Sequence, residues 1–141
     1  MNLIFAKLYE EYIRKNYPAK FSITMYISIV YFFFSSILFL PIKTFVDKQI
    51  LDNQFYYEKT SIMIVVFGQL TIITCLVYYR YIRKKHIEIL VKKYQLRKIN
   101  KTLLYLFVVA TPVTLLLIAA TITVFINGGE ILGNRIEEIF N

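Results

Sequence analysis

Three long stretches of the chain contain no charged residue. They cover residues 21–42, 60–79 and 102–129, which are 22, 20 and 28 residues long. A helix needs about 20 apolar residues to cross a hydrocarbon layer of ~30 Å, so each stretch is long enough to span a membrane. Uncharged runs of 18 or more residues favour transmembrane helices over the core helices of a soluble protein. The pattern predicts an all-α integral membrane protein with transmembrane helices at about 21–42, 60–80 and 102–127.

The chain before the first span has the periodicity of an amphipathic helix. One half of its helical wheel is apolar and rich in tyrosine: Phe5, Ala6, Leu8, Tyr9, Tyr12, Ile13 and Tyr17. Because proline cannot continue a helix, Pro18 is expected to end it. We therefore predict an N-terminal amphipathic interfacial helix within residues 1–18, lying flat on the inner membrane surface. The alternative is that its apolar face packs on segment 80–101.

Segment 80–101 contains neither Gly nor Pro, and Ile87, Leu90, Val91 and Tyr94 form a narrow apolar stripe within it. The absence of helix breakers predicts that span two continues straight beyond the membrane for two or three turns. The chain is then expected to turn near residues 97–101, and Asn100 is expected to cap span three.

The spans are expected to form one bundle over residues 19–129. Pro41 is expected to end span one at little cost. After a hinge at residues 127–129, Asn134 and Glu137 have the spacing of a capping box. This spacing predicts a short C-terminal helix within the tail, residues 130–141.

Positive charge is divided unequally among the segments that connect the spans. Thirteen of the 17 Lys/Arg residues lie in residues 1–20 and 80–101, and four lie in residues 43–59 and 130–141. The positive-inside rule then predicts that the N-terminus and segment 80–101 lie in the cytoplasm. The C-terminus is expected to be extracytoplasmic. Bulky residues near the end of the first run indicate an uncleaved span rather than a signal peptide. We expect a multi-pass protein of a bacterial cytoplasmic (inner) membrane.

Residues 21–42, 60–79 and 102–129 contain no Asp, Glu, Lys, Arg or His, which argues against a self-contained pump or secondary transporter. The sequence also has no Gly-rich phosphate loop, Cys/His cluster or nucleophile elbow. We therefore expect a non-enzymatic protein without catalytic residues, metal ligands, cofactors or a small-molecule substrate. Arg80 and His86, with five residues between them, resemble over seven residues the signature of HEPN ribonucleases. Because that family's helical-bundle context is absent, we interpret His86 as a solvated interfacial residue.

The basic segment is the first candidate site. Each cation near an anionic membrane surface contributes ~1 kcal/mol of binding, so these side chains are expected to bind anionic phospholipid or a partner. The candidate residues are Arg80, Arg83, Lys84, Lys85, Lys92, Lys93, Arg97 and Lys98.

The second candidate site lies inside the membrane. Gln69 and Pro112 lie at similar depths on spans two and three. Pro112 leaves the carbonyl of Val108 without its helical donor and is expected to kink span three there. We expect Gln69 to bond that carbonyl or Thr111, or alternatively to meet a second copy of the chain. Small residues on each span favour close helix packing within the bundle or a homo-oligomer. They are Ser28 and Ser35, Gly68, Thr71 and Cys75, and Ala110, Thr114 and Thr121.

These features favour an accessory or interaction protein, such as a subunit or an immunity-type protein. Its expected partners are a bilayer with anionic phospholipids and either a second copy or another membrane protein. One alternative is a pore-forming or membrane-perturbing effector. A second is a membrane tether for nucleic acid or acidic partners through residues 80–101, although nucleic acid is the less expected of the two ligands.

Overall fold

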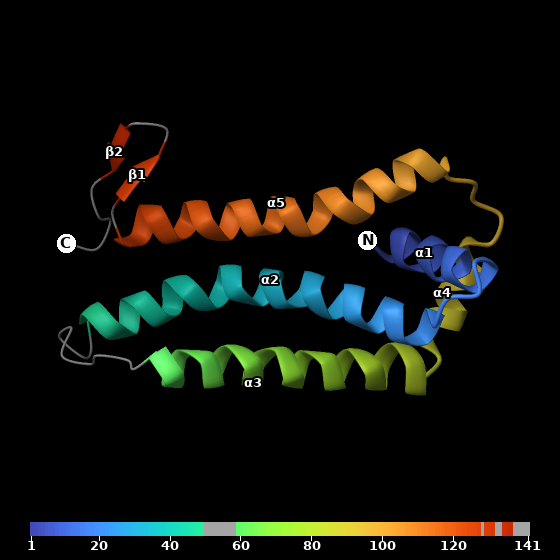
Figure 1. Cartoon of the computed structure of the whole chain (residues 1–141), viewed down its shortest axis with the longest axis horizontal. Helices are drawn as coiled ribbons and strands as arrows, with labels where there is room; N and C mark the ends of the chain where they lie inside the picture. The colour runs from blue at the N-terminus through green and yellow to red at the C-terminus, as the bar shows by residue number, and fades with distance from the viewer. Residues whose placement is uncertain (50–58, 128, 132–133, 137–141) are drawn as a thin grey trace.

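The computed structural model describes residues 1–49, 59–127, 129–131 and 134–136 (Figure 1). Its longest helices are α2 (Ala19–Gln49), α3 (Lys59–Val77) and α5 (Lys101–Asn127). The stretches long and apolar enough to cross a membrane are Ala19–Val46, Thr60–Arg83 and Lys101–Ile126. The prediction of three such helices is therefore confirmed by length and composition.

Helix α2 lies between the other two long helices; α3 runs antiparallel to it, and α5 runs parallel to it (Figure 1). It packs on α3 along one side and on α5 along the other. Since α3 has only one long neighbour, just 6% of its most apolar stretch is buried within the chain. Its remaining surface is apolar and is suited to contact with lipid.

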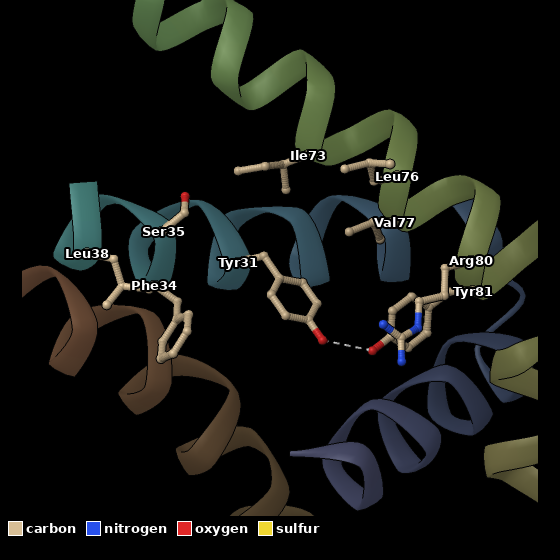
Figure 2. Close-up of a pocket in the computed structure, with 9 residues that line it drawn as sticks. All are labelled: Tyr31, Phe34, Ser35, Leu38, Ile73, Leu76, Val77, Arg80 and Tyr81. Carbon is tan, nitrogen blue, oxygen red and sulfur yellow. Dashed lines mark hydrogen bonds between the residues drawn. The ribbon is translucent and has the colours of Figure 1, made fainter.

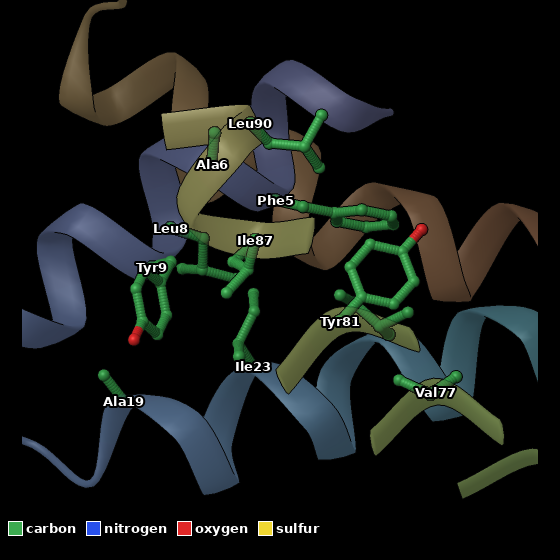
Figure 3. Packing of buried hydrophobic residues seen from close by; sticks show 11 residues of the cluster. Phe5, Ala6, Leu8, Tyr9, Ala19, Ile23, Val77, Tyr81, Ile87 and Leu90 are labelled. Carbon is green, nitrogen blue, oxygen red and sulfur yellow. The ribbon is translucent and has the colours of Figure 1, made fainter. Parts of the chain in front are cut away.

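A compact group of short elements covers one end of the three long helices. It comprises α1 (Asn2–Arg14), the π-helical turn η1 (Tyr78–Arg83) and α4 (His86–Tyr94), and we call it the basic-end cap. Its apolar side chains, the first turns of α2 and the last residue of α3 form one buried cluster (Figure 3). The members are Phe5, Ala6, Leu8, Tyr9, Ala19, Ile23, Ile27, Val77, Tyr81, Ile87 and Leu90.

The apolar face of α1 packs on protein, so the expectation that this face lies on lipid is wrong. Phe5 and Leu8 are 2% and 1% exposed, and Ile87 and Leu90 of α4 are buried in the same cluster. The Phe5 ring also meets the ring of Tyr81 edge-on, with 6.2 Å between centroids. The physical reason is that α1 and α4 each have one apolar stripe, and each stripe covers the other.

Helix α1 ends at Arg14, before Pro18, so the predicted terminator is wrong. Asn16 adopts a left-handed conformation with φ 55°, and its N–H donates to the Ile13 carbonyl at 3.1 Å. The Tyr17 N–H donates to the Tyr12 carbonyl at 3.0 Å, and the two tyrosine rings are 6.3 Å apart. These bonds and this contact are those of a Schellman motif.

Segment 80–101 does not continue span two as a straight helix, which corrects that prediction. The turn η1 ends at Arg83, and Lys85 has φ 53°, so the chain changes direction before α4 begins at His86. This break allows the stripe of α4 to reach α1. The expected cap is confirmed, because the Thr102 N–H donates to Asn100 Oδ1 at 3.1 Å and α5 begins at Lys101.

Two expectations about prolines have opposite outcomes. Helix α2 continues through Pro41 to Gln49, so Pro41 does not end span one. Proline is tolerated inside apolar helices because neighbouring groups satisfy the backbone it leaves free. Pro112, by contrast, was expected to kink span three, and Figure 1 shows α5 bending near its middle. The N-terminal half of α5 diverges from α2, and α1 lies between them (Figure 1).

The tail begins as a small antiparallel ribbon rather than a helix. Strand β1 (Gly129–Ile131) pairs with β2 (Asn134–Ile136), with Glu130 opposite Arg135. Asn134 therefore lies in a strand, paired with Ile131, and not at the start of a helix as the capping box predicted. The rest of the predicted helix, including Glu137, lies outside the described residues.

Candidate functional site

The basic-end cap brings together the two segments that hold most of the positive charge. Residues 1–20 and 80–101 contain thirteen Lys/Arg and three Asp/Glu, a net charge of +10 in a chain whose total is +8. They share one end of the molecule because α1 packs on α4. The rest of the sequence therefore carries a net charge of −2.

All eight cations predicted to bind lipid or a partner are exposed, on the cap or in the segments next to it. Arg80 and Arg83 lie on η1, and Lys84 and Lys85 occupy the break before α4. Two more pairs follow: Lys92 and Lys93 are in the last turn of α4, and Arg97 and Lys98 lie between α4 and α5.

Aromatic rings hold several of these cations near the surface. The Lys84 ammonium lies 5.1 Å from the centre of the Tyr79 ring. Lys93 and Arg97 both approach Tyr94, at 5.7 and 5.9 Å. Such contacts restrict the side chains without neutralising them, so their charges remain available to an anionic partner.

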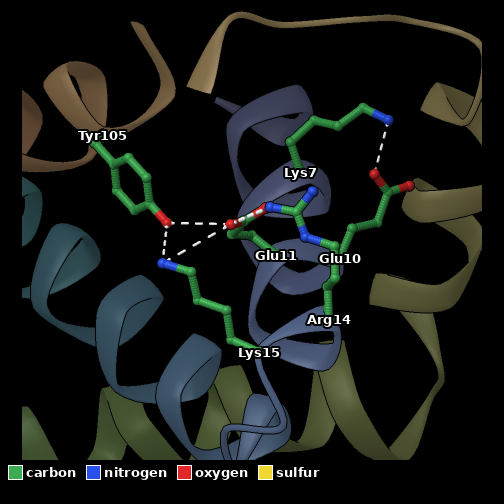
Figure 4. Close-up of polar contacts among 6 residues, drawn as sticks. All are labelled: Lys7, Glu10, Glu11, Arg14, Lys15 and Tyr105. Atoms are coloured by element: carbon green, nitrogen blue, oxygen red, sulfur yellow. Dashed lines mark hydrogen bonds and ion pairs between the residues drawn. The ribbon is translucent and has the colours of Figure 1, made fainter. Parts of the chain in front are cut away.

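The two carboxylates of α1 are paired within the cap (Figure 4). Glu10 accepts from Lys7 at 2.8 Å. Glu11 is buried, pairs with Arg14, lies 3.8 Å from Lys15 and accepts from Tyr105 at 3.3 Å. The hydrogen bond from Arg14 is the largest cause that lowers the pKa of Glu11. Lys15 also donates to Tyr105 at 2.6 Å, which raises the pKa of Lys15.

A hollow of about 340 Å³ lies where α1 meets the segment that leads into α5. Its lining includes the paired residues of α1 together with cations of the second segment, Arg97, Lys98 and Lys101. The Lys7 ammonium connects α1 to this segment by donating to the Gln95 carbonyl at 3.5 Å. The hollow is therefore a basic surface built from both segments and suited to an anion.

The intramembrane contact predicted between spans two and three is replaced by a different one. Gln69 Nε2 donates to Ser35 Oγ on α2 at 2.7 Å. Thr111 donates to the Phe107 carbonyl of its own helix at 2.7 Å, and Pro112 also lies on α5. Because α2 separates α3 from α5, Gln69 meets span one. Sequence reasoning matched the depths of these residues, but depth does not define which helix faces which.

Sequence reasoning missed a groove between α2 and α3 (Figure 2). It has a volume of about 290 Å³. The hydroxyls of Tyr31 and Tyr81 are 3.1 Å apart at one end of it. Helical spacing was the available signal, since Tyr31 and Ser35 are one turn apart on α2, as are Val77 and Tyr81 on the other wall. The pairing of these two faces could not be derived from spacing alone.

By length and composition, the three long helices are those of a multi-pass membrane protein. Among the described residues, no group of three or more His, Cys, Asp or Glu is placed to hold a metal ion. No protein-family model, curated protein or solved structure matches the chain.

Proposed function

We propose that this chain is a small non-enzymatic accessory protein of a bacterial cytoplasmic membrane, which acts by binding another membrane protein or a second copy of itself. The observation that carries this proposal is the basic-end cap: α1 and α4 fold together into one basic surface at one end of an apolar bundle. The positive-inside rule places this surface in the cytoplasm and the C-terminus outside. There it contacts anionic phospholipid headgroups.

The exposed side of α3 supports an interaction within the membrane. Gly68, Thr71 and Cys75 lie on one face of α3, and Thr71 and Cys75 are exposed. A Cβ added at Gly68 would meet no atom within 4 Å, so nothing in the described chain packs closely there. Small residues let a neighbouring helix approach closely in lipid, which suits this face to a second transmembrane helix.

The experiment is co-purification in mild detergent of a tagged copy with an untagged copy and with other membrane proteins. We expect a stable complex with the wild-type chain, and its loss on Gly68→Leu, which would hold a partner helix away. The matched control is Ala120→Leu, which enlarges an exposed small residue on α5 and should keep the complex. A chain that is monomeric and free of partners in every variant would contradict the proposal.

The second candidate function is a tether for an acidic partner. The basic hollow between α1 and the segment that leads into α5 favours it. It would bind through Arg97, Lys98 and Lys101, and its affinity would fall steeply with salt. Retention of an acidic polypeptide by vesicles containing the protein, lost on joint Arg97→Gln and Lys98→Gln substitution, would support this candidate. Retention unaffected by the substitutions would contradict it.

The spans give less support to a pore. Thr71, Thr74, Thr111 and Thr121 all donate their hydroxyls to carbonyls of their own helices at 2.7–2.8 Å. These bonds reduce the polarity that a water-filled channel would need. Leakage of entrapped dye from vesicles containing the purified chain would favour the pore over the accessory role.

A further inference from the structure

The groove between α2 and α3 combines a long apolar wall with a polar end. Phe34 and Leu38 of α2 and Ile73 and Leu76 of α3 provide apolar lining, and Phe34, Leu38 and Leu76 are 54–63% exposed. The groove is therefore open along its side. Its volume of about 290 Å³ lies at the lower limit of ~300–1,000 Å³ for small-molecule pockets. An open groove of this size suits a flexible chain better than an enclosed small molecule.

The polar end contains Arg80 and the hydrogen-bonded hydroxyls of Tyr31 and Tyr81 (Figure 2). Arg80 lies three residues before the end of the span Thr60–Arg83, about one turn inside it at 1.5 Å per residue. This is the depth at which a long cationic side chain reaches the headgroup region. Within the described part of the chain, no carboxylate lies at ion-pair distance from Arg80.

We propose that the groove binds one anionic phospholipid, with the phosphate at Arg80 and one acyl chain along the apolar wall. A guanidinium offers two parallel donors to phosphate oxygens, and of the two hydrogen-bonded tyrosine hydroxyls one keeps its O–H free to donate beside it. Arg83 and Lys84, close by in sequence, add positive potential that selects a net negative headgroup over a zwitterionic one. The acyl chain covers apolar side chains that the rest of the protein leaves exposed.

This site is distinct from the general attraction of the basic-end cap for anionic membranes. A diffuse surface charge attracts many headgroups equally and does not depend on any one cation. The groove instead pairs one particular cation with an adjoining apolar wall. The lipid site is also independent of the accessory role, since it can be present whether or not another protein binds to α3.

The chain contains no Trp, so a single introduced Trp can report on the groove. We would compare Phe34→Trp, which lines the groove, with Phe67→Trp, which is 66% exposed on α3 and does not line it. Each variant is reconstituted in zwitterionic vesicles containing a small fraction of lipid brominated on the acyl chain, with either an anionic or a zwitterionic headgroup. At each position we take the ratio of quenching by the two lipids, which cancels differences in the depth and exposure of the introduced Trp.

At Phe34→Trp we expect about five-fold enrichment of the anionic lipid, the factor that corresponds to ~1 kcal/mol for one cation. Added Arg80→Gln should return the ratio to that of the Phe67→Trp control. Added Arg83→Gln, which removes an equal charge from the same turn but does not line the groove, should leave most of the enrichment. Equal quenching by both lipids, or enrichment that survives Arg80→Gln, would overturn the proposal. Protection of Phe34→Trp from both lipids would overturn it as well, and would show that protein covers the groove.

Discussion

At the scale of single residues, Glu11 connects α1 to α5. Its carboxylate pairs with Arg14 of the same helix and accepts from Tyr105 of α5, so one buried side chain joins two elements. Lys15 supports the same contact by donating to Tyr105. Glu11 is thus the acidic group whose protonation most directly weakens the attachment of α1.

Acidification should therefore destabilise the cap through Glu11. Its pKa in the folded chain is lowered from the usual value of 4.5, chiefly by the hydrogen bond from Arg14. A lowered folded-state pKa means that Glu11 contributes stability above pH 4.5, and that the contribution is lost as pH falls through the folded-state pKa. We expect the melting temperature in detergent to fall between about pH 6 and pH 3 by less in Glu11→Gln than in wild type. Glu10→Gln is the control and should keep the full decrease; an identical pH profile for Glu11→Gln would contradict this role.

At the scale of elements, the main contact of α1 is the packing of its apolar face against α4. Phe5 is 2% exposed and packs against Tyr26 and Tyr81 at centroid distances of 6.0 and 6.2 Å. Ile13 lies on the same helix but is 54% exposed. The two positions therefore separate packing within the cap from the properties of the helix itself.

Phe5→Ala should weaken the cap strongly. Removing a well-packed phenylalanine typically costs about 3–5 kcal/mol, because it leaves a cavity as well as lost apolar burial. We expect a clear decrease in melting temperature in detergent, and a much smaller one for Ile13→Ala. Equal effects of the two substitutions would show that α1 is held by lipid or detergent and not by packing in the buried cluster.

Gln69 contributes a polar contact between α2 and α3 by donating to Ser35. Gln69→Leu should loosen these two helices by about 0.6 kcal/mol, with an upper value of about 1.7. Disulfide cross-linking between cysteines placed on α2 and α3 should become slower, while cross-linking between α2 and α5 should stay unchanged. Thr111→Val serves as the control on α5. A larger effect on the α2–α5 pair would contradict the observed partner of Gln69.

The same elements show how far the sequence alone could lead. The three long helices were predictable because lipid requires about 20 apolar residues per span and no charged group within it. The end of α1 was not, because Pro18 is a strong general breaker while Asn16 acts only through a local left-handed turn. The docking of α1 on α4 was also open, since an apolar stripe is covered equally well by lipid or by another stripe. The two-tyrosine groove required knowledge of which helix faces are neighbours.

At the scale of the whole molecule, the three long helices alternate in direction along the chain, which places residues 1–20 and 80–101 at one end and strands β1 and β2 at the other (Figure 1). The net charge of +10 on the first end makes it expensive to move across a membrane, since each Lys or Arg at mid-bilayer costs about 2.5–3.5 kcal/mol. The charge division and the fold therefore favour the same orientation, with the basic-end cap in the cytoplasm.

Cysteine labelling in intact cells tests this orientation most directly. Cys75 is the only cysteine, so Cys75→Ser provides a background into which Lys92→Cys on α4 and Arg135→Cys on β2 can be introduced separately. With a membrane-impermeant thiol reagent, we expect Arg135→Cys to be labelled at once and Lys92→Cys only after the membrane is permeabilised. Labelling of Lys92→Cys in intact cells, with protection of Arg135→Cys, would contradict the account.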